Sequence, residues 1–140
     1  MREYTLQDDR LFRQCLKEMM DHPAIQKLKL IPQHKGGTTY AHCVNVANRA
    51  YQLARRWHWD IDIPALVRGA MLHDYYLYDT RTMPYSDYRH SIVHPKLAVA
   101  NAGELSFIFL LGFLKIALAI HGILCFHTKC KVFFFFVLIL

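Results

Sequence analysis

Apolar residues recur every three or four positions through most of residues 1–104, which is the spacing of amphipathic α-helices. A first helix is predicted over residues 5–21, where the apolar positions share one face and charged residues take the other. A short second helix is predicted after Pro23, and Pro32 is expected to stop it. The same spacing predicts a third helix over about residues 40–57.

Two prolines are expected to mark the starts of the next helices. Pro64 suits the first position of a fourth helix, because its missing N–H and fixed φ cost nothing there. This helix is predicted to reach His73-Asp74. Pro95 is expected to start a fifth helix that ends near Asn101.

The segments between these helices are rich in residues that break regular structure. The segment 34–39 contains Gly36 and Gly37, and its threonines can cap the third helix. A tyrosine-rich loop is predicted at about residues 78–89. No segment of useful length alternates with a period of two, so we predict an all-α bundle of about five helices over residues 1–104.

The pattern changes after Glu104. Residues 105–126 hold one Lys and one His, and residues 132–140 are wholly apolar, so an apolar helical tail is predicted over 105–140. As a membrane segment, the 14 Leu, Ile and Phe residues of 105–126 outweigh the cost of burying Lys115. Alternatively, the tail is an out-of-frame reading of an AT-rich gene, which gives phenylalanine runs and no acidic residues.

Composition limits the class of protein. A chain of 140 residues suits one compact domain, and 54% hydrophobic with 20% charged residues excludes a disordered chain. The net charge of +6 suits an anionic substrate such as a phosphate ester, and the absence of a like-charge block argues against a nucleic-acid duplex as partner. The polar N-terminus lacks the apolar core of a signal peptide, so a cytoplasmic location with reduced cysteines is expected.

Several residues of the helical part have side chains that bind metal ions. Histidine nitrogens and aspartate oxygens suit borderline or hard divalent ions. Adjacent residues diverge by about 100° on a helix, so His73 and Asp74 reach one ion only where it lies between their helix and a neighbour. The third helix, which carries His42, can be that neighbour. The candidate ligands are His34, His42, His73, Asp74, His90 and His94.

Three stretches carry a resemblance to a known family: His42-Cys-Val-Asn-Val-Ala, Leu66-Val-Arg-Gly-Ala-Met-Leu-His73-Asp74 and His94-Pro-Lys-Leu-Ala98. Over about residues 25–104 the chain resembles the HD-domain metal-dependent phosphohydrolases. It is most similar to small stand-alone bacterial members with Gln-His-Gly-x-Thr before the first ligand. The segment 33–38, Gln-His-Lys-Gly-Gly-Thr, is a looser version of that motif.

This resemblance implies an HD-like helical fold around one or two divalent metal ions (Mn, Mg, Fe, Co or Ni). His42, His73 and Asp74 match ligand positions, and His94 matches an additional ligand of two-metal members. His94 precedes Pro95 and can instead cap a helix. The family's final ligand, an Asp on a later helix, has no counterpart here because no acidic residue follows Glu104. Weakened metal affinity is therefore expected.

The implied activity is hydrolysis of a small phosphate ester or nucleotide, with Asp74 as the catalytic carboxylate and metal-bound water as the nucleophile. Residue type and neighbourhood select His34, Lys35 and Arg68 for binding the substrate phosphate. Two alternatives stay open. One is a non-catalytic HD remnant that binds a nucleotide or partner, with or without a membrane tether. The other is a di-iron oxygenase on the same scaffold.

The tyrosines after the His-Asp pair also have two interpretations. They can line a nucleoside pocket by stacking, or they can cover an edge of the core. The second is favoured for Tyr75, Tyr76, Tyr78, Tyr85 and Tyr88.

Overall fold

The computed structural model describes residues 1–33, 36–79 and 87–103, apart from the side chains of 87–92, 94 and 95. Helices account for the regular structure of these ranges, and no strand occurs in them. The prediction of an all-α protein is therefore confirmed for this part of the chain. The elements in chain order are α1 (Leu6–Asp21), α2 (Pro23–Gln26), the 3₁₀ turn η1 (Lys27–Leu30), α3 (Thr39–Arg56), α4 (Ile63–Leu72) and α5 (Asp87–Gly103).

The first helix begins at a capping box. The Thr5 hydroxyl accepts from the backbone N–H of Asp8 at 3.2 Å, and the Asp8 carboxylate accepts from the backbone N–H of Thr5 at 2.8 Å. These bonds satisfy two N–H groups that the helix start leaves unpaired. Phe12 and Leu16 are buried on the inner face, as the apolar spacing predicts.

The predicted second helix consists of two short pieces. After α2 the chain tightens into η1, in which Leu28 is fully buried and Leu30 is 86% exposed. Pro32 then forms an isolated antiparallel bridge with Thr38, which closes the loop before α3. Thr38 caps α3, since its hydroxyl accepts from the backbone N–H of Ala41 at 3.2 Å, and this confirms the predicted capping role.

The fourth helix begins one residue earlier than predicted. Asp62 is its N-cap and accepts from the backbone N–H of Ala65 at 2.9 Å, so Ile63 occupies the first position and Pro64 the second. Proline fits the second position for the same reason as the first, because that N–H has no partner within the helix. The helix ends at Leu72, just before the His-Asp pair.

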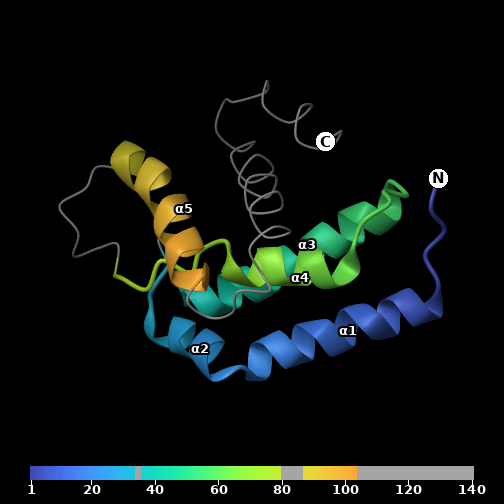
Figure 1. Ribbon diagram of the computed structural model, residues 1–140, viewed down its shortest axis with the longest axis horizontal. Helices are drawn as coiled ribbons and strands as arrows, with labels where there is room; N and C mark the ends of the chain where they lie inside the picture. Colours follow the sequence, from blue (N-terminus) through green and yellow to red (C-terminus); the bar gives the residue numbers. More distant parts are fainter. Residues whose placement is uncertain (34–35, 80–86, 104–140) are drawn as a thin grey trace.

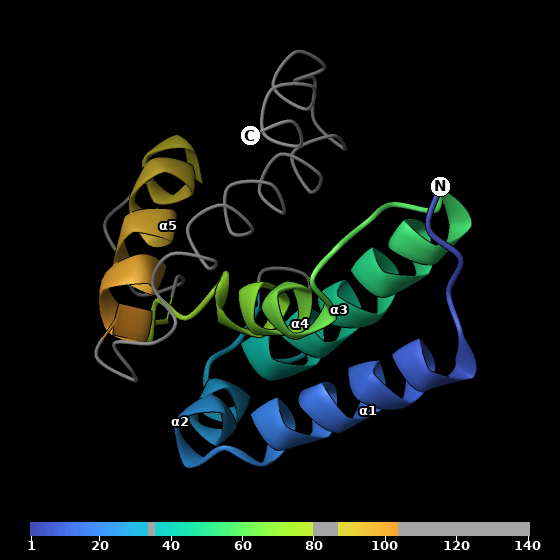
Figure 2. The same cartoon turned by 45° about the vertical axis from the view of Figure 1, so that its right-hand side comes forward.

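The helices pack around a core centred on α3 and α4. Figure 1 shows α1 running alongside the α3–α4 pair, and Figure 2 confirms this arrangement from a second direction. In both views α5 stands at the end of this group away from the N-terminus, where it contacts α4. Fully buried side chains of the core include Ile25, Leu28, Cys43, Ile63, Val67 and Met71.

The prediction that Pro95 starts the fifth helix is wrong. α5 begins at Asp87, eight residues earlier, and it takes the last three residues of the predicted loop 78–89. Proline inside a helix removes one backbone hydrogen bond, and here that loss does not end the helix. Near its C-terminal end, α5 packs against the core through Ala98 and Ala102, which are almost completely buried. The amide of Asn101 donates to the carbonyl of Tyr75 at 3.0 Å.

Among the described residues, no helix is both long enough and apolar enough to cross a membrane. The predicted apolar tail, residues 105–140, lies outside the described residues. Both interpretations of that segment therefore stay predictions.

Candidate metal centre

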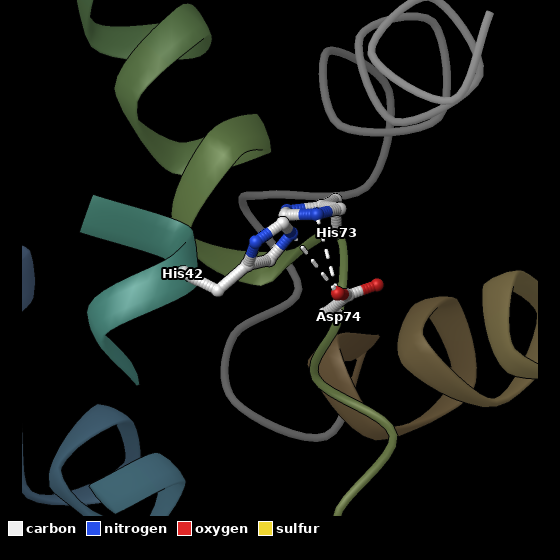
Figure 3. A group of neighbouring side chains, drawn as sticks. All are labelled: His42, His73 and Asp74. Carbon is white, nitrogen blue, oxygen red and sulfur yellow. Dashed lines mark ion pairs between the residues drawn. The ribbon is translucent and has the colours of Figure 1, made fainter. Parts of the chain in front are cut away.

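Three side chains selected from the sequence meet at one point beside the start of α3 and the end of α4 (Figure 3). The Nε2 atom of His42 lies 3.5 Å from Oδ2 of Asp74, and Nε2 of His73 lies 3.4 Å from the same oxygen. The two imidazole rings are 5.3 Å apart and tilted by 49°. One ligand atom from each residue lies within 4.8 Å of the other two.

Two separate segments bring these ligands together. His42 lies in the first turn of α3, where its backbone N–H donates to the carbonyl of Thr38 at 3.1 Å. His73 is the C-cap of α4, and Asp74 follows in a turn closed by a 3.0 Å bond from the N–H of Tyr75 to the carbonyl of Leu72. Side chains of adjacent helical residues point about 100° apart. Because Asp74 lies past the last residue of α4, this limit does not apply to the side chains of His73 and Asp74.

A backbone carbonyl fixes the orientation of His73. Nδ1 of its ring lies 2.8 Å from the carbonyl oxygen of Ala70, one turn earlier on α4. A carbonyl oxygen only accepts hydrogen bonds, so Nδ1 carries the proton. In the neutral ring the lone pair then belongs to Nε2, the nitrogen that faces Asp74. This arrangement prepares Nε2 to bind a cation.

Burial and neighbouring charge act in opposite directions on the two histidines. Burial lowers the pKa of His42, and the nearby His73 lowers it further, against an opposing effect of Asp74. Burial also lowers the pKa of His73, but the Asp74 carboxylate and the neighbouring Cys43 together raise it, and the net result is a pKa well above its ordinary value. The Asp74 carboxylate therefore favours the protonated form of His73 in the metal-free protein.

The donor set fits a divalent ion, and so do the distances from the two histidines to Asp74. Nitrogen and oxygen ligands at about 2.0–2.2 Å from an ion lie roughly 3.0–3.5 Å from one another, which matches the two Asp74 distances. The side chain of His73 is 1% exposed and that of Asp74 is 10% exposed, whereas that of His42 is 31% exposed. The centre is therefore reached from solvent on the side of His42.

Two further residues contact this centre and were not selected as site residues from the sequence. The Gln33 side-chain amide donates to Oδ2 of Asp74 at 3.4 Å. The Cys43 thiol lies 4.0 Å from Nδ1 of His73, and burial raises the pKa of Cys43, so this thiol is uncharged at neutral pH. Gln33 could have been selected from the sequence, because it lies in the motif before the first ligand. Cys43 gave no indication of a role at the site beyond its place on the apolar face of the third helix.

The remaining predicted site residues are placed less fully. His94 belongs to α5, two turns before Asn101, and its side chain lies outside the described part. His34 and Lys35 also lie outside the described residues. Arg68 is half-buried on α4, and its charge acts on the Cys15 thiol of α1, whose pKa is raised chiefly by burial. The roles of these four residues in binding metal or phosphate stay predictions.

The tyrosines beside the centre belong to the core. Tyr75 and Tyr76 are 2% and 3% exposed, and Tyr78 is partly buried against the same cluster. Burial raises the pKa of Tyr76 to about 12. This confirms the expected core-edge role for these three residues, whereas Tyr85 and the side chain of Tyr88 lie outside the described part.

No family model, no curated protein and no solved structure matches this chain.

Proposed function

We propose that this protein is a metal-dependent phosphohydrolase that acts on a small phosphate ester or a nucleotide. The observation that supports this most strongly is the convergence of His42, His73 and Asp74, whose ligand atoms lie within 4.8 Å of one another. His42 of α3 supplies one of these atoms, and His73 and Asp74, 31 and 32 positions later and directly after α4, supply the other two. The HD-type spacing of the same residues in the sequence is the second support.

Each ligand contributes a distinct property. His73 is held by Ala70 with Nε2 directed at the centre. Asp74 supplies the negative charge that favours a cation there, and the partly exposed His42 lies where substrate and water enter. When bound, a divalent ion lowers the pKa of a coordinated water and neutralises charge on phosphoryl oxygens.

The substrate phosphate is assigned to basic side chains of two segments, the loop before α3 and the helix α4. His34 and Lys35 precede Gly36 and Gly37, whose loop is tied to the start of α3, the helix that carries His42. Arg68 is the third proposed contact, since a guanidinium binds phosphate through two parallel hydrogen bonds. His94 is proposed as an additional ligand, because Asn101 docks the same helix onto the turn after Asp74.

Metal analysis followed by an assay tests this proposal. The purified protein is loaded with Mn²⁺ and incubated with p-nitrophenyl phosphate, a generic phosphomonoester. We expect turnover that falls by more than about tenfold in Asp74→Asn and is unchanged in Asp60→Asn, whose exposed carboxylate pairs with Arg2. Bound metal without turnover on phosphate esters would instead support the non-catalytic alternative. Two bound irons with oxygen uptake would support the oxygenase.

A further inference from the structure

Gln33 begins the loop before α3 that contains Gly36 and Gly37, here called the glycine loop, and its side chain contacts the proposed ligand Asp74. Its side-chain amide bridges two residues of the turn after α4. The NH₂ group donates to Oδ2 of Asp74 at 3.4 Å, and the carbonyl end accepts from the Tyr76 hydroxyl at 3.5 Å. Gln33 thus contacts the same carboxylate oxygen that faces Nε2 of His42 and Nε2 of His73.

The chemistry of these partners allows one orientation of the amide. An ionised carboxylate only accepts hydrogen bonds, so it must meet the NH₂ end. The phenolic hydroxyl of Tyr76 donates to the opposite end. An amide is the neutral side chain that has a donor and an acceptor at this separation, and no other uncharged residue of this length reproduces both contacts.

The backbone of Gln33 is held by the loop that it begins. Its N–H donates to the carbonyl of Gly37 at 3.2 Å, and its carbonyl accepts from the N–H of Gly36 at 3.0 Å. A 2.8 Å bond from the N–H of Thr39 to the carbonyl of Ile31 ties the base of this loop to the first residue of α3. The loop that fixes the backbone of Gln33 is therefore tied to α3 one helical turn before His42.

We propose that Gln33 positions the Asp74 carboxylate, so that the glycine loop holds the third metal ligand in place. Gln33 is a positioning residue, because its contact with the centre is made through Asp74. The proposal rests on the proposed function for its effect on metal binding, but the placement of Asp74 is a property of the metal-free chain.

The first experiment needs no metal. Crystal structures of the EDTA-treated protein are compared for the wild type and for Gln33→Met, which keeps the length of the side chain and removes the amide. We expect the Asp74 carboxylate to rotate away from Nε2 of His42 in Gln33→Met, with the helices unchanged. An Asp74 carboxylate in its wild-type position in the variant would overturn the proposal.

The second experiment measures Co²⁺ affinity by its visible absorption. We expect the dissociation constant to rise on the order of tenfold in Gln33→Met, and by less in Tyr76→Phe, which frees the other end of the amide. Gln52→Met on the exposed side of α3 is the matched control and should bind like the wild type. Equal affinities in the wild type, Gln33→Met and Tyr76→Phe would contradict the proposal.

The two experiments separate the two proposals. If the wild type binds no Co²⁺, the proposed function fails, and the metal-free structures still decide whether Gln33 positions Asp74. Should Gln33→Met not fold, Tyr76→Phe provides both comparisons. A wild-type protein that binds Co²⁺ with an unmoved Asp74 in the variants would leave the metal centre standing and refute the role of Gln33.

Discussion

The carbonyl oxygen of Ala70 accepts a 2.8 Å hydrogen bond from Nδ1 of His73, and this contact determines what the opposite nitrogen can bind. With the proton on Nδ1, the Nε2 lone pair of a neutral ring faces Oδ2 of Asp74 at 3.4 Å. A lone pair and a carboxylate at this distance repel each other unless a cation lies between them. Either a proton on Nε2 or a divalent metal ion removes this repulsion, and the two compete for the position between Nε2 and Oδ2.

Replacing His42 should weaken metal binding without unfolding the protein. His42 is partly exposed, so His42→Asn removes one ligand and little packing. We expect the Mn²⁺ dissociation constant, measured by calorimetry, to rise at least about tenfold. His58→Asn is the matched control, because His58 is exposed beyond the end of α3 with φ at +53°, which asparagine tolerates. Equal weakening in both variants would contradict this assignment of His42.

The stability of the metal-free protein should depend on pH through His73. Because its folded pKa is raised, its contribution is fully present below the unfolded pKa of about 6.5 and is lost as pH rises through the folded value. His42 acts in reverse, since its folded pKa is lowered, and its contribution is lost as pH falls below about 6.5. Urea unfolding in EDTA should therefore show a declining free energy on the alkaline side.

Asp74→Asn isolates the cause of that decline. The substitution keeps the size of the side chain and removes the charge that raises the pKa of His73. We expect the alkaline loss of unfolding free energy to disappear in Asp74→Asn and to persist in Asp60→Asn, whose carboxylate is 89% exposed. A decline of the same slope in wild type and Asp74→Asn would show that another group causes it.

The free energy of unfolding should depend strongly on the side chain of Leu28 and hardly at all on that of Leu30. Leu28 is fully buried in η1, whereas Leu30, two residues later, is 86% exposed. Leu28→Ala should lower the free energy of unfolding by about 2–5 kcal/mol, because it leaves a cavity. Leu30→Ala should change it by less than about 0.5 kcal/mol. Chemical denaturation checks both, and equal effects would contradict the packing of η1.

Substitutions of Gly37 should destabilise the protein through backbone strain rather than through steric clashes of the new side chain. Gly37 has φ at +82°, and a Cβ atom placed there would have no neighbouring atom within 4 Å. Gly37→Ala should therefore cost about 1–2 kcal/mol through backbone strain alone, and Gly37→Asn should cost less. Thermal melts of the two variants test this ranking. A harmless Gly37→Ala would show that the loop takes another conformation.

Much of the helical part could be predicted from the sequence, because apolar spacing and capping residues are local signals. Thr38 and Asp62 sit immediately before α3 and α4, and both cap them. The start of α5 was mispredicted, since the preference of proline for a helix start is a statistical tendency that Pro95 does not follow. The split between α2 and η1 was not predicted, because the spacing of apolar residues does not distinguish an α-helical turn from a 3₁₀ turn.

The candidate site, too, could be predicted only in part from the sequence. The resemblance to the HD-domain family implied that His42, His73 and Asp74 meet, and the structure places them together. The contact between Gln33 and Asp74 was not, because it joins residues 41 positions apart through a loop whose path depends on two glycines with positive φ. The hydrogen bond from His73 to the carbonyl of Ala70 could not be predicted either. Every residue has a backbone carbonyl, and only the geometry of α4 places this one beside the ring.

Anomalous diffraction from crystals of the full chain grown with Mn²⁺ tests the central claim most directly. The wild-type protein should give an anomalous peak in bonding contact with Nε2 of His42, Nε2 of His73 and a carboxylate oxygen of Asp74, and Asp74→Asn should lose most of that peak. A wild-type crystal at saturating Mn²⁺ with no anomalous density among these three side chains would contradict the metal centre and the function derived from it.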